Sequence, residues 1–282
     1  MWKLQKPCNK NALDELKTAF TYKDGSKKYT VTEDELQIIK EIYNHYETVK
    51  GVACDPLKAE RLSQSTREAI YYAYSEVQEN NRLEGLRSRL LLDAGLCPCC
   101  GILSADELDH HLPRSKFNSL AVYSSNLVPI CHKCNNKKRT VTGEEPNKRF
   151  VHTYYDDIND NEQFLKVKIE IKESSLRMKF YIEKTKEMTD LLAQQLIFQI
   201  ERVNLNERLE KDGNIFMSSF GGALKYGYKN GTAGVKEILI STANDTKNKL
   251  GLNHWRTVLL LALADHEDFC NGGFIRSLGM QE

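Results

Sequence analysis

The sequence has almost no net charge and no long apolar segment. Its 40 basic residues oppose 39 acidic ones, which leaves a formal net charge of +1. This balance excludes a histone-like binder, but it does not exclude an enzyme that holds nucleic acid transiently. The longest aliphatic run, Val258–Ala264, is far too short to cross a bilayer. The N-terminus carries no signal-peptide pattern, so we expect a cytoplasmic protein that makes no membrane contact.

Internal repeats, low-complexity tails and a nucleotide-binding loop are also absent from the sequence. Glycines gather between residues 221 and 234, near Lys225 and Lys229, but no Gly-Lys-Ser/Thr step follows them. We expect these glycines to form turns and helix caps. The informative residues are instead the cysteines, histidines and asparagines of one short segment.

Four of the eight cysteines form two Cys-x-x-Cys pairs, Cys97/Cys100 and Cys131/Cys134. Disulfides are uncommon in cytoplasmic proteins, whereas four thiolates at this spacing are typical of a tetrahedral zinc site. Four sulfur ligands close such a site and leave no position for a catalytic water. The sequence therefore predicts a structural zinc. A redox role for one pair and four unrelated buried thiols are the alternatives.

Hydrophobic periodicity divides the chain into three regions. Thr32-x-x-Glu35 and Ser65-x-x-Glu68 are capping boxes ahead of periodic apolar runs, so residues 1–95 are expected to be helical. Residues 96–156 keep no helical period and have little apolar surface, so this core depends on the cysteines. Alternation over 164–171 and 176–182 predicts a β-hairpin in the region 157–282. A helix over 188–209 then begins a helical C-terminal part.

Three short motifs lie between and directly after the cysteine pairs. The first is Asp109-His110-His111-Leu112-Pro113, the second begins with Asn126-Leu127, and the third is Asn135-x-x-Lys138. In this order and at these separations they resemble the HNH nuclease family, specifically its zinc-stabilised ββα-metal branch. The match covers roughly residues 96–138, about a sixth of the chain. The resemblance implies a small ββα-metal core within a fold that is mainly α and α+β overall.

These residue types suit phosphodiester hydrolysis. A histidine that is neutral near pH 7 can take a proton from water, and carboxylate and amide oxygens are ligands for Mg²⁺ or Mn²⁺. The resemblance implies that His110 is the general base and that Asp109 and Asn135 hold a single catalytic metal. It also implies that Asn126 holds the His110 region in place through side-chain hydrogen bonds. Asn135 stands where the family name has a histidine, a variant that occurs in the family.

Basic residues cluster around the motifs although the whole chain is nearly neutral. We predict contacts with nucleic-acid phosphates for Arg114, Lys116, Lys137, Lys138 and Arg139. Among them, Lys138 is expected nearest to the scissile phosphate, because it completes the Asn-x-x-Lys step. The alternative is a solvated basic surface without a ligand.

Two histidines and one tyrosine cluster have alternative interpretations. His111 follows His110 on an extended strand and faces the other way, which favours a structural role over an exchange of roles with His110. His152 is expected to pack against the metal core, and a catalytic role is the alternative. The cluster Tyr71-Tyr72-Ala73-Tyr74 is expected in the hydrophobic core rather than as a base-stacking platform.

The sequence therefore favours a metal-dependent endonuclease that cuts DNA with a histidine-activated water. The alternative from another class is a non-catalytic zinc module that binds nucleic acid or protein. The helices before and after the core are also loosely similar to HNH subunits of bacterial anti-phage systems such as Septu. That similarity implies an ATPase partner that controls cleavage, whereas a stand-alone restriction or homing-type nuclease would need none.

Overall fold

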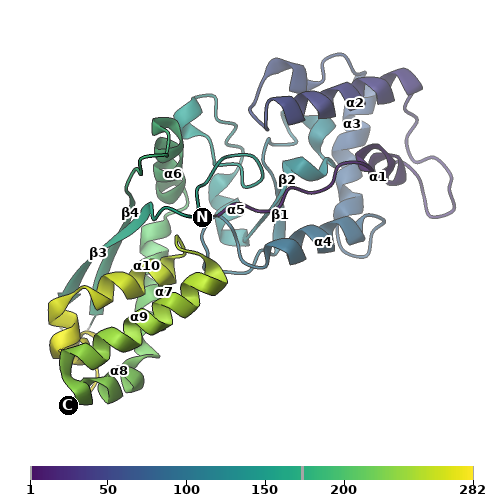
Figure 1. Cartoon of the computed structure of the whole chain (residues 1–282). Helices are drawn as coiled ribbons and strands as arrows, with labels where there is room; N and C mark the ends of the chain where they lie inside the picture. The colour runs from purple at the N-terminus through teal and green to yellow at the C-terminus, as the bar shows by residue number, and fades with distance from the viewer. Residues whose placement is uncertain (1, 173–174, 282) are drawn as a thin grey trace. The chain divides into compact units, whose positions relative to one another are not determined.

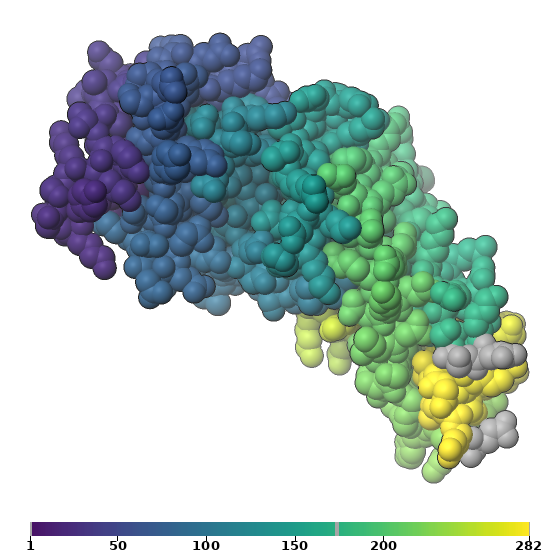
Figure 2. Space-filling model, turned by 180° about the vertical axis from the view of Figure 1, so that it is seen from behind, coloured from purple at the N-terminus to yellow at the C-terminus, as the bar shows by residue number. Residues whose placement is uncertain are grey.

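The computed structural model describes residues 2–172 and 175–281 and divides into two compact units (Figure 1). The first unit is Lys3–Asp157, and the second is Ile158–Glu282 together with Met1–Trp2. Figure 2 colours the first unit from purple to teal and most of the second from green to yellow. Helices predominate among the described residues, which also form two two-stranded antiparallel sheets, so the fold is mainly α and mixed α+β, as expected. In that part of the chain, none of the helices has both the length and the hydropathy to span a bilayer.

Helices α1 to α4 make up the N-terminal part of the first unit. They are α1 (Ala12–Ala19), α2 (Glu33–Thr48), α3 (Gln64–Ala73) and α4 (Glu84–Ala94). The predicted capping box at Thr32 is confirmed, because the Thr32 hydroxyl accepts from the Glu35 N–H and the Glu35 carboxylate accepts from the Thr32 N–H. The start of α3 differs from the prediction. Ser63, and not Ser65, caps this helix by accepting from the Thr66 N–H.

The sheet of the first unit lies within the cysteine-rich segment. Strand β1 (Glu107–His110) pairs antiparallel with β2 (Leu127–Ile130), and α5 (His132–Lys138) begins two residues after β2 ends. Asp109 lies opposite Val128 in the register, and His110 lies opposite Leu127. The long connection between the strands contains two short 3-10 turns, η3 (Asn118–Leu120) and η4 (Ser124–Asn126). The observed order is therefore strand, long loop, strand and helix.

One hydrophobic core joins the N-terminal helices to this sheet. It includes Leu16 of α1, Ile39 of α2 and Ile70 of α3, as well as Leu108 of β1 and Leu127 of β2. Burial of such side chains is the main favourable contribution to folding. The expected division between residues 95 and 96 is therefore a change of local structure within one unit.

A hairpin and six helices make up the described part of the second unit. Strand β3 (Leu165–Lys172) pairs with β4 (Ser175–Ile182), as expected, and the residues 173–174 of the predicted turn lie outside the described residues. The helices are α6 (Asp190–Arg202), α7 (Leu205–Ser218), α8 (Gly221–Gly227), α9 (Gly231–Leu250), α10 (Trp255–Ala264) and α11 (Phe274–Ser277). The predicted single helix over 188–209 is wrong, because Asn204 has a φ of 50° and separates α6 from α7.

Asparagines and glycines complete the packing of the second unit. The Asn206 side chain bonds to both backbone groups of Phe180, and Asn214 does the same for Leu176. These bonds protect an edge of β4 that could otherwise pair with another chain. Gly227 and Gly234 allow α8 and α9 to approach closely, because a Cβ on either glycine would collide with the backbone of the other.

Candidate active site and metal centre

The four paired cysteines form one buried cluster. The Sγ atoms of Cys97, Cys100, Cys131 and Cys134 all lie within 4.8 Å of one another. A turn closed by the bond from the Gly101 N–H to the Cys97 carbonyl, 2.8 Å long, carries the first pair, and the start of α5 carries the second. Zinc–sulfur bonds of about 2.3 Å place the sulfurs of a tetrahedral site about 3.8 Å apart. The Cys100 and Cys131 sulfurs are 3.8 Å apart, so the cluster fits a structural metal such as zinc.

A cleft of about 970 Å³ opens beside β1. Asp109 and His110 line it from the end of β1, and Asn135 lines it from α5. Three of the four residues predicted for catalysis or the catalytic metal therefore meet in one cleft. The fourth, Asn126, is fully buried behind it.

His110 is held in one tautomer by the backbone. Its Nε2 atom lies 2.9 Å from the carbonyl oxygen of Ala121. Because a carbonyl only accepts, Nε2 carries the proton and Nδ1 is left as the acceptor. Burial lowers the pKa of His110 to about 3, so the ring is neutral at pH 7. The Tyr74 ring meets it edge-on, with 4.4 Å between the ring centroids.

Asp109 is buried against Lys138. The Lys138 ammonium lies 2.8 Å from the Asp109 carboxylate and also donates to the carbonyl oxygens of His110 and His111, at 3.0 and 3.3 Å. Burial raises the pKa of the Asp109 carboxyl, and the charge of Lys138 opposes that rise. The Lys138 residue is 2% exposed and its ammonium pairs with Asp109, which disfavours the predicted contact with a phosphate.

The other predicted phosphate contacts are placed differently from one another. Arg114 is half-buried and lines the cleft. Lys116 is exposed and pairs with Glu144 at 3.2 Å. Lys137 and Arg139 are exposed near the end of α5. Of these four described residues, Arg114 alone belongs to the wall of the cleft.

Asn135 is oriented by a carboxylate that sequence reasoning missed. Its Nδ2 atom donates to Glu107 at 2.7 Å, and the second carboxylate oxygen of Glu107 lies 2.7 Å from Nδ1 of His132. Burial would raise the pKa of Glu107, but the bonds from Asn135 and His132 outweigh it and lower that pKa. With Nδ2 engaged, Asn135 presents Oδ1 as its free ligand atom. Glu107 could have been found by strand alternation, since it lies two residues before Asp109 and shares its face.

The Asn126 side chain links two parts of the loop between β1 and β2 through hydrogen bonds. Its Oδ1 atom accepts from the Leu112 N–H at 2.8 Å and from the Tyr46 hydroxyl at 3.1 Å. Its Nδ2 atom donates to the carbonyls of Leu112 and Leu120, at 3.1 and 3.2 Å. Leu120 directly precedes Ala121, whose carbonyl orients His110. The side-chain hydrogen bonds expected of Asn126 near His110 are therefore present.

His111 and His152 stack on each other away from the cleft. Their ring centroids are 4.0 Å apart with an interplanar angle of 30°. Burial lowers the pKa values of both imidazoles well below their usual range. His152 also lies 3.0 Å from the Tyr46 hydroxyl, and a Cβ on Gly51, whose φ is +74°, would collide with its ring. This placement favours the structural interpretation of both histidines.

The tyrosine cluster lines the cleft and does not fill the core. Tyr71, Tyr72 and Tyr74 all face the cleft, and Tyr72 is 60% exposed. Only Ala73 of the four-residue cluster is buried. Tyr74 is partly buried and packs against the hydrophobic core of the first unit. The expected core position is wrong for the exposed Tyr72, and Tyr71 is half-buried.

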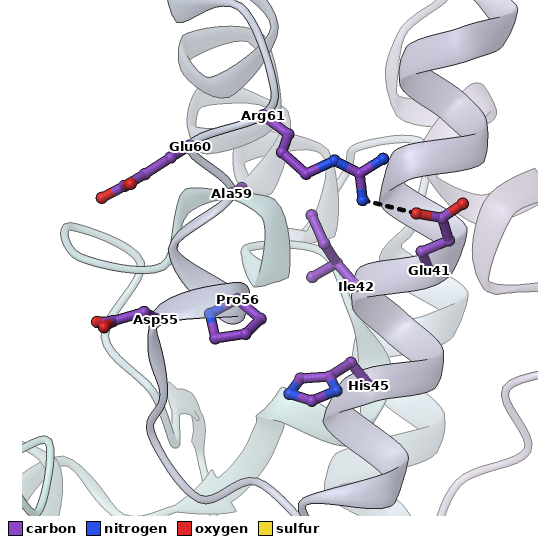
Figure 3. A pocket seen from close by; sticks show the side chains of 8 residues that line it. All are labelled: Glu41, Ile42, His45, Asp55, Pro56, Ala59, Glu60 and Arg61. Atoms are coloured by element: carbon purple, nitrogen blue, oxygen red, sulfur yellow. Dashed lines mark hydrogen bonds and ion pairs between the residues drawn. The ribbon is translucent and has the colours of Figure 1, made fainter.

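A second hollow of about 450 Å³ lies between α2 and the segment 55–61 (Figure 3). The Arg61 guanidinium points toward Glu41 and pairs with it at 2.7 Å. His45 lies 3.4 Å from the Cys54 sulfur. Arg61 and Glu41 therefore pair with each other, and the hollow contains none of the motif residues.

No known protein family, curated protein or solved structure matches this chain significantly. Only the residues of the cleft and the cysteine cluster therefore indicate a function.

Proposed function

We propose that this protein is a metal-dependent nuclease of the HNH type that hydrolyses phosphodiester bonds in DNA. One observation carries the proposal: Asp109, His110 and Asn135 converge on one cleft beside the four-cysteine cluster. The antiparallel pair β1–β2 followed by α5 is the order expected of a ββα-metal core.

The donor set of the cleft fits Mg²⁺ or Mn²⁺. Asp109 offers a carboxylate and Asn135 an amide oxygen, and both are hard ligands. Lys138 contacts Oδ2 of Asp109, which leaves Oδ1 for a metal. A divalent ion bound there would supply positive charge to the scissile phosphate and the departing oxygen.

His110 supplies the base in the proposed reaction. Its Nδ1 atom accepts a proton from a water molecule, and the water oxygen attacks phosphorus. The bond from phosphorus to the 3′ oxygen breaks, and this oxygen takes a proton from solvent, which gives a 5′ phosphate and a 3′ hydroxyl. His110 then releases its added proton to solvent. The Ala121 carbonyl keeps the proton of the resting ring on Nε2, so that Nδ1 is ready to accept.

Cleavage of supercoiled plasmid with Mg²⁺ or Mn²⁺ tests this proposal. We expect His110→Ala to slow cleavage by about 100- to 10,000-fold, the usual range for a general base. His45→Ala is the matched control, because His45 lies in the same unit outside the cleft. Equal cleavage by the wild type and His110→Ala would exclude this role for His110.

A non-catalytic zinc module is the second candidate, and Lys138 favours it. Its ammonium already neutralises Asp109 and would compete with a metal for that carboxylate. Titration with Mn²⁺ followed by electron paramagnetic resonance separates the two candidates. Specific Mn²⁺ binding that Asp109→Asn abolishes supports the nuclease, and its absence supports the zinc module. A folded chain that binds both metals but does not cut would direct attention to a partner, such as the ATPase that the Septu-like plan implies.

A further inference from the structure

A continuous row of planar groups leads from the surface to His110. The rings of Tyr72 and Tyr71 meet edge-on, with 5.2 Å between centroids. The Arg114 guanidinium carbon lies 4.5 Å from the Tyr71 centroid and 5.0 Å from that of Tyr74. The Tyr74 ring then contacts His110 at 4.4 Å. These groups come from α3, the turn η2 (Tyr74–Val77) and the loop after β1.

Hydrogen bonds hold the inner part of this row, and the outer ring is exposed. Arg114 donates to the Tyr71 carbonyl at 3.3 Å, and the Tyr74 hydroxyl donates to the Leu108 carbonyl at 2.9 Å. Tyr72 is 60% exposed at the end of the row. Tyr72 lies in the wall of the same cleft as the candidate catalytic histidine, and its exposed ring is accessible to a ligand.

The wall of the cleft combines two kinds of groups. Asp106, Glu107 and Asp109 are acidic, although Arg87 also lines the cleft and donates to the Asp106 carbonyl at 2.7 Å. The three tyrosines and Arg114 add aromatic and basic groups. A planar base can stack on tyrosine while its phosphate approaches the guanidinium. The volume of about 970 Å³ is at the upper end of the range of about 300–1,000 Å³ for small-ligand pockets, which leaves room for a nucleotide.

We propose that Tyr72 and Tyr71 form a stacking subsite for one unpaired base of a DNA strand whose phosphate lies beside His110. This inference rests on the proposed nuclease function and names its substrate class. Paired bases in a duplex stack on each other and do not offer a free face. The substrate is therefore single-stranded DNA or a locally unpaired segment.

Fluorescence anisotropy with labelled DNA tests the subsite without requiring cleavage. The probe is a mixed-sequence single strand of about 12 nucleotides, within the range that single-strand binding sites cover. The same strand annealed to its full complement, with no loop or overhang, is the comparison. His110→Ala serves as the background for all variants, so that the probe stays intact.

Tyr72→Ala is the informative variant, and Tyr226→Ala is its matched control because Tyr226 is 73% exposed on α8 of the other unit. We expect Tyr72→Ala to weaken single-strand binding by about 5- to 150-fold, as loss of one stacked base does. Tyr72→Phe and Tyr226→Ala should bind like the background protein. Duplex binding should not change in any of them.

An abasic probe identifies the contact as stacking. One missing base at the position bound by Tyr72 should weaken binding to the background protein but cause little further loss for Tyr72→Ala. The subsite is excluded if Tyr72→Ala matches Tyr226→Ala, or if it weakens single strands and duplex equally. If the protein binds single strands through Tyr72 but cleaves no DNA, the stacking subsite is supported and the nuclease function is excluded. If it cleaves duplex DNA equally with and without Tyr72→Ala, the nuclease function is supported and the stacking subsite is excluded.

Discussion

The ammonium group of Lys138 lies 2.8 Å from the carboxylate of Asp109, and the two side chains are only 3% and 10% exposed. The same ammonium donates to the carbonyls of His110 and His111. The pair therefore connects the end of α5 to the end of β1 at the candidate catalytic residues.

Lys138→Met should destabilise the protein by about 3–5 kcal/mol, because Asp109 would remain buried without its opposite charge. Chemical denaturation measures this loss. Lys137→Met is the control, since the neighbouring Lys137 is exposed and should change stability by about 0.5 kcal/mol or less. Addition of Asp109→Asn to Lys138→Met should restore part of the loss. Equal stability of the two methionine variants would contradict the structural role of Lys138.

Cys131→Ser should remove the metal from the cysteine cluster and lower the melting temperature. Cys131 is fully buried and is one of the four clustered sulfurs, and a structural metal contributes its binding energy to folding. Elemental analysis should find about one zinc per wild-type chain and a small fraction of that in the variant. Cys8→Ser is the control, because Cys8 is exposed. A variant that retains its zinc and its melting temperature would disprove a four-sulfur site.

Tyr46→Phe and Tyr43→Phe should change the stability of the protein differently, although both tyrosines lie on α2 and are buried. The Tyr46 hydroxyl bonds to Asn126 and His152, so its removal leaves buried polar atoms unpaired and should cost about 1–3 kcal/mol. The Tyr43 hydroxyl is buried without a hydrogen-bond partner, and its removal should be neutral or stabilising. Urea denaturation compares them. A similar loss in both variants would show that hydrogen bonding does not decide the difference.

Glu35 should make stability depend on acid pH. Hydrogen bonding from the Ser63 hydroxyl is the main cause that lowers the pKa of Glu35 from 4.5 to about 2. Because the folded pKa is the lower one, Glu35 stabilises the fold above pH 4.5, and this contribution is lost as the pH falls toward 2. Glu35→Gln should cost about 1 kcal/mol or less at pH 7, since water screens the site, and should flatten the decline in acid. Melting curves between about pH 5 and 2 measure this effect. Glu33→Gln, in the same helical turn, should follow the wild type.

The predictions that the structure confirms came mostly from patterns of a few consecutive residues. The spacing of Cys97 and Cys100 requires only a turn, so the metal cluster could be inferred without the fold. The Thr32 capping box likewise depends on four consecutive residues. In contrast, the break at Asn204 was not predicted, although the buried positions change phase there, from Leu196 and Ile200 on α6 to Leu205 and Leu209 on α7.

Burial depends on contacts between distant segments and was harder to predict. Lys138 looked like a surface charge, yet it follows Cys134 by four residues on α5, and this spacing places both on one buried face. That signal was present in the sequence. Tyr71 and Tyr72 are adjacent on α3 and therefore point to different sides of the helix, and the sequence does not show which side another element covers.

The cysteine cluster also sets when the proposed site can exist during synthesis. Asp109, His110 and Asn126 all lie in the loop that the sulfurs of Cys100 and Cys131 close. A growing chain emerges from the ribosome in order, so this ring stays open until Cys134 is released. A nascent chain therefore carries the residues of the proposed site unassembled until both cysteine pairs can bind one metal ion.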